Sequence, residues 1–159
     1  MKRSFLNSVY CLKHCSSSTA PNVLKPGYIL KQSRIFSMSE ITEYSKLTHD
    51  YNPLHFDSEC ARNAGFSDTP IPGLVVASLF PRIIASHFPG AIYVKQTLEF
   101  RTPVLVGDRI TGEVEANNIR QLKDKFMVKF TTTCLKDGGS VVISGDATAI
   151  LPSLAVKED

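Results

Sequence analysis

The feature that most constrains the fold is a change of hydrophobic period near residue 90. Before it, the segment from Gly73 to about Ser86 is apolar almost all round, which predicts a buried helix that is bent or interrupted by Pro81. After it, apolar and polar residues alternate with a period of two, as in half-buried strands. A helix-rich first half followed by an antiparallel meander predicts a single α+β domain whose antiparallel sheet wraps around a long central helix.

The expected elements can be placed along the chain. An opening strand is expected over 28–36, a helix over 39–48 with Ser39 as its cap, and a short helix, capped by Asp57 or Ser58, that ends at Ala64. The later strands are indicated by three alternating apolar sets, which are Val94, Leu98 and Phe100; Ile110, Val114 and Ala116; and Phe126, Val128, Phe130 and Cys134. A hairpin turn at 137–139 leads into a last strand over 141–151.

A candidate proton-transfer site lies in the segment Asp50-Tyr51-Asn52-Pro53-Leu54-His55. In an unbroken helix, residues five apart point away from one another, but Pro53 biases Asn52 out of the helical region, so Asp50 and His55 can converge. A carboxylate and an imidazole around one water can exchange the protons that adding water to a carbon-carbon double bond, or removing it, requires. The same residues also fit an ordinary turn with His55 exposed in a loop.

The sequence around this segment resembles a known family, the MaoC-like, R-specific enoyl-CoA hydratases. The similarity covers 24–151 and is carried by Tyr44 to Asp57, Gly65-Phe66, Ile71 to Phe80, Leu98-Glu99-Phe100 and Pro103 to Asp108. It implies a hot-dog fold and reversible dehydration of (3R)-3-hydroxyacyl thioesters to trans-2-enoyl thioesters, a hydro-lyase reaction, with mitochondrial type II fatty acid synthesis as its setting. A hot-dog thioesterase and a non-catalytic acyl-thioester-binding scaffold protein are the alternatives.

The resemblance also assigns roles to residues. It places the catalytic acid/base pair at Asp50 and His55, and it implies that the Gly73 N–H donates a hydrogen bond to the thioester oxygen. It makes Asn52 and Ser78 supporting residues. Asn52 either holds the turn or orients His55, and Ser78 is expected to bond a preceding carbonyl rather than to act as a nucleophile. Two positions depart from the family pattern, because Pro72 replaces a common histidine and Pro81 replaces a common serine. Neither change removes an acid, a base or a backbone donor.

The charge distribution separates the N-terminus from the rest of the chain. All fifteen acidic residues lie at Glu40 or later, whereas six of the eighteen Lys and Arg precede it, so the remainder has twelve basic residues and a formal charge of about −3. This balance argues against a nucleic-acid-binding domain. A leader over 1–22 that is rich in Ser and basic residues and free of acids predicts a mitochondrial presequence and a matrix location, with a disordered tail as the alternative. The hot-dog domain then covers 23–152, and 153–159 form a C-terminal tail.

Partners and cofactors follow from the same sequence. No cofactor and no metal are expected, because Cys11 and Cys15 lie in the leader, while Cys60 and Cys134 are isolated and lack metal-like spacing. No stretch approaches the roughly twenty apolar residues of a membrane span. The resemblance implies a homodimer and a substrate on acyl carrier protein or CoA. An acidic carrier would dock on basic side chains, for which the candidates are Arg62, Arg82, Lys95 and Arg101.

Overall fold

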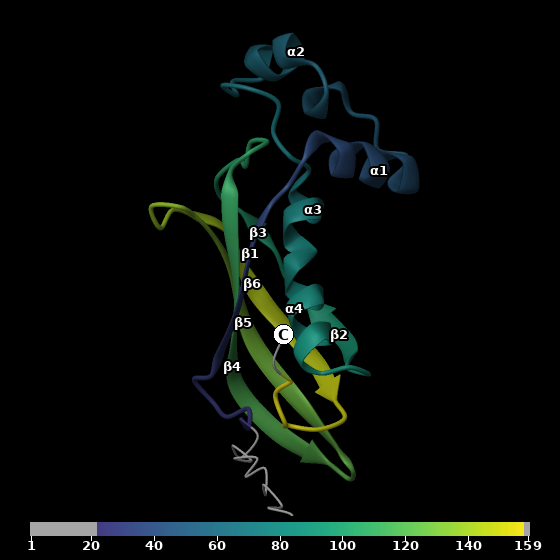
Figure 1. Cartoon of the computed structure of the whole chain (residues 1–159), viewed down its shortest axis with the longest axis vertical. Helices are drawn as coiled ribbons and strands as arrows, with labels where there is room; N and C mark the ends of the chain where they lie inside the picture. Colours follow the sequence, from purple (N-terminus) through teal and green to yellow (C-terminus); the bar gives the residue numbers. More distant parts are fainter. Residues whose placement is uncertain (1–21, 158–159) are drawn as a thin grey trace, which may run out of the picture.

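The computed structural model describes residues 22–157, so the predicted leader lies almost entirely outside the described residues. One antiparallel sheet curves around a central helical segment (Figure 1). The strands are β1 (Ile29–Ile35), β2 (Ile92–Gln96), β3 (Glu99–Phe100), β4 (Arg109–Leu122), β5 (Lys125–Lys136) and β6 (Val141–Leu151). Their order is β1-β4-β5-β6-β2, with β3 also paired to β6. The expected α+β class, with a sheet wrapped around a helix, is confirmed.

The sheet presents one apolar face to that helix. Along β4 the residues Ile110, Val114 and Ala116 are buried, as are Val128 and Phe130 on β5. These residues alternate with polar neighbours, so the period of two read from the sequence assigns the core face of both strands correctly. The hairpin between β5 and β6 turns at Gly138 and Gly139, whose φ angles of +92° and +86° are strained for residues with a side chain.

The central helix is broken, but not at the proline itself. It consists of α3 (Gly73–Ala77) and α4 (Leu79–His87), which meet at Ser78. Pro81 has no N–H to donate to the carbonyl of Ala77, and its ring crowds that carbonyl, so the break falls before the proline. None of the helices within residues 22–157 has the length and apolar character to cross a membrane.

The expectation that this helix is buried all round is wrong. Its sheet-facing side is buried at Leu79, Phe80, Ile83 and Ile84. The opposite side is exposed at Leu74, Ser78, Pro81, Arg82 and Ala85. The central helix is therefore apolar on two faces, and the sheet covers only one of them.

The strand expected from Val94 to Phe100 is also interrupted. It forms β2 and β3, which both pair with β6, and between them the Thr97 backbone comes very close to β6 at Gly145. A Cβ atom at position 145 would lie 1.9 Å from the Thr97 carbonyl oxygen, so only glycine allows this approach. Val94, which lies at a register shift within β2, and Phe100 are exposed rather than on a core face.

The segment between β1 and the central helix holds α1 (Met38–Thr48), the 3-10 helix η1 (Pro53–His55) and α2 (Ser58–Asn63). It lies beyond one end of the sheet (Figure 1). The helix α1 is capped by Ser37, not by Ser39 as expected, because Ser37 and Glu40 form a reciprocal capping box. Asp57 caps α2, as expected. This segment brings His55, one of the two predicted proton-transfer residues, close to the start of α3.

The described C-terminal residues pack on the body of the domain. The Leu24 N–H donates to the Leu154 carbonyl at 2.8 Å, and the Val156 N–H donates to the Asn22 carbonyl at 2.8 Å. Leu154 and Val156 are partly buried against the core. Residues 153–157, placed outside the domain by the sequence interpretation, thus extend it.

Candidate active site

A largely apolar cavity of about 460 Å³ opens between η1, the start of α3 and the segment that follows β3. Its walls include Leu54, Phe66, Val76, Phe100, Val104 and Val142. His55 and Gly73 line the same cavity. An apolar pocket with a few convergent polar groups is the usual form of a small-molecule site.

His55 is held in one tautomer. Its Nδ1 lies 2.7 Å from the Pro70 carbonyl oxygen, and a carbonyl can only accept, so Nδ1 carries the hydrogen. In the neutral ring, Nε2 then has the free lone pair and can accept a proton. The η1 turn positions the residue, because the His55 N–H donates to the Asn52 carbonyl at 3.1 Å.

Asp50 is half-buried and follows the end of α1, where His49 adopts the left-handed conformation with a φ of +59°. Its Oδ1 accepts a hydrogen bond from the Asn52 N–H at 3.2 Å. The structure gives no direct hydrogen bond between Asp50 and His55, both of which lie among the described residues, and Asp50 does not line the cavity. The two residues lie in one short segment, but only the imidazole of His55 reaches the cavity.

Gly73 is the first residue of α3, where helical N–H groups have no acceptor within the helix. Pro72 precedes it and provides no side-chain cap. A Cβ atom at position 73 would lie 2.4 Å from Cε1 of Phe100. The Phe100 ring therefore lies directly against Gly73, and both residues line the cavity.

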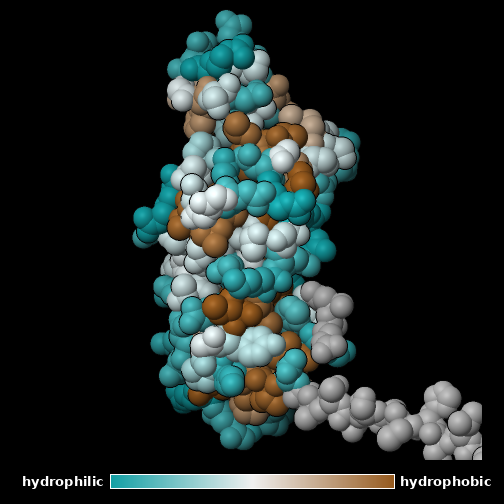
Figure 2. Space-filling model, turned by 60° about the vertical axis from the view of Figure 1, so that its left-hand side comes forward, coloured by the Kyte–Doolittle hydropathy of each residue, from teal (hydrophilic) through white to brown (hydrophobic). Residues whose placement is uncertain are grey.

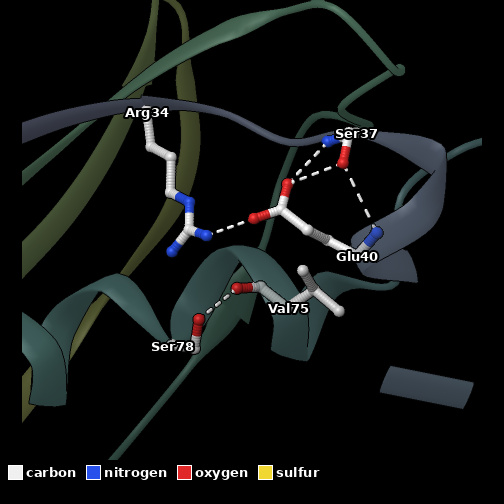
Figure 3. A network of polar contacts seen from close by, with 5 residues as sticks. All are labelled: Arg34, Ser37, Glu40, Val75 and Ser78. Carbon is white, nitrogen blue, oxygen red and sulfur yellow. Dashed lines mark hydrogen bonds and ion pairs between the residues drawn. The ribbon is translucent and has the colours of Figure 1, made fainter. Parts of the chain in front are cut away.

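The two residues predicted to support the pair, Asn52 and Ser78, make local contacts. The Ser78 hydroxyl donates to the Val75 carbonyl at 2.5 Å within the helix (Figure 3). Ser78 does not line the cavity. The Asn52 Oδ1 accepts from the Leu54 N–H at 3.1 Å, which closes the η1 turn. Both side chains therefore stabilise the local backbone conformation.

Two contributors to the site were not found from the sequence. Pro70 received no predicted role in the site, although its carbonyl orients His55 from fifteen positions away. Phe100 was assigned to a core face, although its ring covers Gly73. No local pattern connects residues so far apart, so neither contact has a sequence signal.

The two cysteines among residues 22–157, Cys60 and Cys134, lie outside this chemistry. Cys134 is buried on β5, and burial raises the pKa of its thiol to about 12. A thiol in that state is inert as a nucleophile at neutral pH. Cys60 is half-buried in α2, where its N–H donates to the Asp57 carboxylate.

Comparison with solved structures identifies the class to which this fold belongs. The chain superposes on the (R)-hydratase from A. caviae involved in PHA biosynthesis with a TM-score of 0.75, at 34% identity and over 81% of this chain and 98% of that one. The fold is a hot-dog domain, as the sequence predicted.

Sequence comparison then gives the family. Residues 21–137 match the MaoC like domain, and the chain belongs to this family. It is 57% identical to the tomato (Solanum lycopersicum) protein named 3-hydroxyacyl-(acyl-carrier-protein) dehydratase FERN, mitochondrial, over 99% of this chain and 93% of the relative. It is 49% identical to the Arabidopsis thaliana protein named mitochondrial 3-hydroxyacyl-(acyl-carrier-protein) dehydratase, over 96% and 93%. The predicted family and hydro-lyase class are confirmed.

Proposed function

We propose that this chain catalyses the reversible dehydration of (3R)-3-hydroxyacyl thioesters to trans-2-enoyl thioesters, with Asp50 and His55 as the acid/base pair and the Gly73 N–H as the donor to the thioester carbonyl. The observation that carries the assignment is the cavity shared by His55 and Gly73. The names of the two plant relatives support the same reaction.

The geometry suits an elimination that begins at Cα. A hydrogen bond from the Gly73 N–H to the thioester oxygen stabilises enolate-like charge and makes the α-proton easier to remove. His55 accepts that proton at Nε2, the nitrogen left free by the bond from Nδ1 to Pro70. The C3 hydroxyl then takes a proton from the Asp50 and His55 pair and leaves as water. Because the pair has gained one proton and lost one, it returns to its starting state. Since Asp50 does not line the cavity, its share of the proton transfer runs through one water position.

The test measures the loss of absorbance as crotonyl-CoA is hydrated by residues 23–159 of the protein. We expect (3R)-3-hydroxybutyryl-CoA as product, and a loss of at least about 100-fold in kcat for both Asp50→Asn and His55→Ala, in the range of general acid/base catalysis. Ser78→Ala is the matched control, because its hydroxyl bonds a helix carbonyl. Release of free thiol would instead identify a thioesterase. Absence of turnover on both CoA and carrier-protein substrates would identify a binding protein.

We further propose acyl carrier protein as the physiological carrier, as the names of the plant relatives indicate for those proteins. Of the four candidate docking cations, Arg101 lines the cavity, where it pairs with Glu99 at 2.5 Å and with Ser144 at 2.8 Å. Arg62, Arg82 and Lys95 are exposed and do not line this cavity. A kcat/KM that is higher for the acyl carrier protein thioester than for the CoA thioester of equal chain length would support this carrier, and the reverse ratio would contradict it.

A mitochondrial location is proposed on the names of the same two relatives, and the matrix on the composition of residues 1–22. N-terminal sequencing of the protein recovered from cells should begin after residue 15 and before residue 26. Recovery of an intact Met1 together with fractionation in the cytosol would contradict the presequence.

A further inference from the structure

Residues 105–108, which have no role in the proposed reaction, form a tight turn between β3 and β4. Asp108 closes this turn from both sides, since its N–H donates to the Leu105 carbonyl at 3.1 Å and its Oδ2 accepts from the Leu105 N–H at 2.7 Å. Gly107 makes the turn possible with a φ of +92°. The carboxylate of Asp108 thus fixes where Leu105 lies.

Lys136, at the end of β5, holds the same carboxylate oxygen. Its Nζ lies 2.6 Å from Asp108 Oδ2, and the two side chains are 23% and 31% exposed. Burial raises the pKa of Asp108, but the hydrogen bonds from Lys136 and from the Leu105 N–H outweigh burial and hold the pKa below its usual value. Because the pair is partly withdrawn from solvent, it is less screened than an ordinary surface ion pair.

The turn is joined directly to the residue that orients His55. Leu105 pairs with Pro70 in an isolated antiparallel bridge, and the Ile71 N–H donates to the Val104 carbonyl at 2.7 Å. These contacts hold the Pro70 peptide on one side, while its carbonyl accepts from His55 Nδ1 on the other at 2.7 Å. An unbroken series of contacts thus runs from Lys136 to the imidazole.

We propose that Asp108, held by Lys136, is a positioning residue that fixes the tautomer and orientation of His55 through Leu105 and Pro70. This inference rests on the proposed function for its kinetic consequence, but not for its structural one. If Pro70 moves, Nδ1 loses its acceptor and the ring can carry its hydrogen on Nε2 instead. That tautomer offers no lone pair to the cavity and cannot take the α-proton.

The experiment combines kinetics with ¹⁵N NMR of the imidazole nitrogens in the full chain, with the His55 signals assigned by their loss in His55→Gln. We expect wild type to show hydrogen on Nδ1 and Asp108→Ala to show a mixture of tautomers. The kcat for crotonyl-CoA should fall by about tenfold in Asp108→Ala with KM changed less than twofold, because small displacements of a catalytic group cost rate rather than binding. The kcat of Lys136→Met should lie between those of wild type and Asp108→Ala. Lys136→Arg should keep at least half of the wild-type kcat.

Asp137→Asn is the matched control, since Asp137 is adjacent in sequence to Lys136 and pairs with Arg109 at 3.9 Å on the exposed side of the hairpin. It should leave kcat and the tautomer unchanged. If Asp108→Ala does not fold, Asp108→Leu decides, because its side chain fills a similar volume but offers no acceptor to the Leu105 N–H. An unchanged His55 tautomer in a folded Asp108→Ala or Asp108→Leu variant, or an equal loss of kcat in Asp137→Asn, overturns the proposal. A wild type without turnover would overturn the proposed function, whereas the tautomer would still decide the role of Asp108.

Discussion

At the residue scale, Gly73 is constrained by a neighbour that is remote in sequence. The Phe100 ring occupies the space that a side chain at position 73 would need. The ring belongs to a β3 residue that is 56% exposed, so it can be displaced, but only by changing the cavity that both residues line.

We expect Gly73→Ala to destabilise the fold by about 1–3 kcal/mol, the usual cost of inserting a methyl group into an occupied space. The same substitution in a Phe100→Ala background should cost less than half as much, since the clashing ring is gone. Urea unfolding of the four proteins of this double-mutant cycle measures the coupling. Equal costs in both backgrounds would show that the ring is not the obstacle.

At the scale of elements, α1 depends on its first turn to deliver Asp50. Ser37 and Glu40 form the capping box, and Arg34 also pairs with Glu40 (Figure 3). The hydrogen bond from the Ser37 N–H, followed by those from its side chain and from Arg34, lowers the pKa of Glu40 below its usual 4.5.

Ser37→Ala should therefore cost about 1 kcal/mol of stability, the typical value for an N-cap. Glu40→Gln should also destabilise at pH 7, but this difference should shrink as the pH falls below about 4.5. The sign follows because a carboxyl group with a lowered folded pKa stabilises the fold only while it is ionised. Thermal unfolding of wild type and Glu40→Gln between pH 3 and 7 is the measurement. Glu43→Gln, in the exposed pair with Lys46, is the control and should cost only a few tenths of a kcal/mol.

The close approach of the Thr97 backbone to β6 at Gly145 is a second element-scale constraint. Gly145→Ala should cost more than about 2 kcal/mol, because its Cβ would meet the Thr97 backbone oxygen at 1.9 Å and backbone cannot move aside easily. Gly112→Ala is the comparison, since its Cβ would meet the Ile83 side chain at 3.0 Å. It should cost less, as denaturant unfolding of both variants would show. A larger cost at position 112 would contradict this account.

At the scale of the whole molecule, one edge of the sheet is unprotected. The terminal strand β2 exposes Ile92 and Val94 at 52% and 53%, and such edges favour pairing with another chain. Apolar side chains also reach the surface in several clusters on the face seen in Figure 2. Together with the exposed face of the central helix, these features support the homodimer that the family resemblance implies.

We expect the protein to sediment as a dimer of about 35 kDa, twice the 17.5 kDa chain, and less once residues 1–22 are removed. The double variant Ile92→Lys, Val94→Lys should sediment as a monomer. Ile29→Lys, on the opposite edge strand β1, is the control and should remain dimeric. A monomeric wild type at micromolar concentration would contradict the dimer.

The sequence by itself determined what local patterns can encode. The period of two assigned Val114 and Phe130 to the core, and the resemblance around Asp50 and His55 gave the family and the fold. These predictions succeed because burial alternates with a fixed period along a strand and because a motif is contiguous in the chain.

Only the tertiary structure decided which groups meet across the fold. It placed the Pro70 carbonyl on His55, the Phe100 ring on Gly73 and the Lys136 ammonium on Asp108. It also moved the helix break to Ser78 and left one helix face uncovered. Such contacts join residues far apart in sequence, and their distances depend on how the sheet curves around the helix. No local pattern of residue types records that curvature.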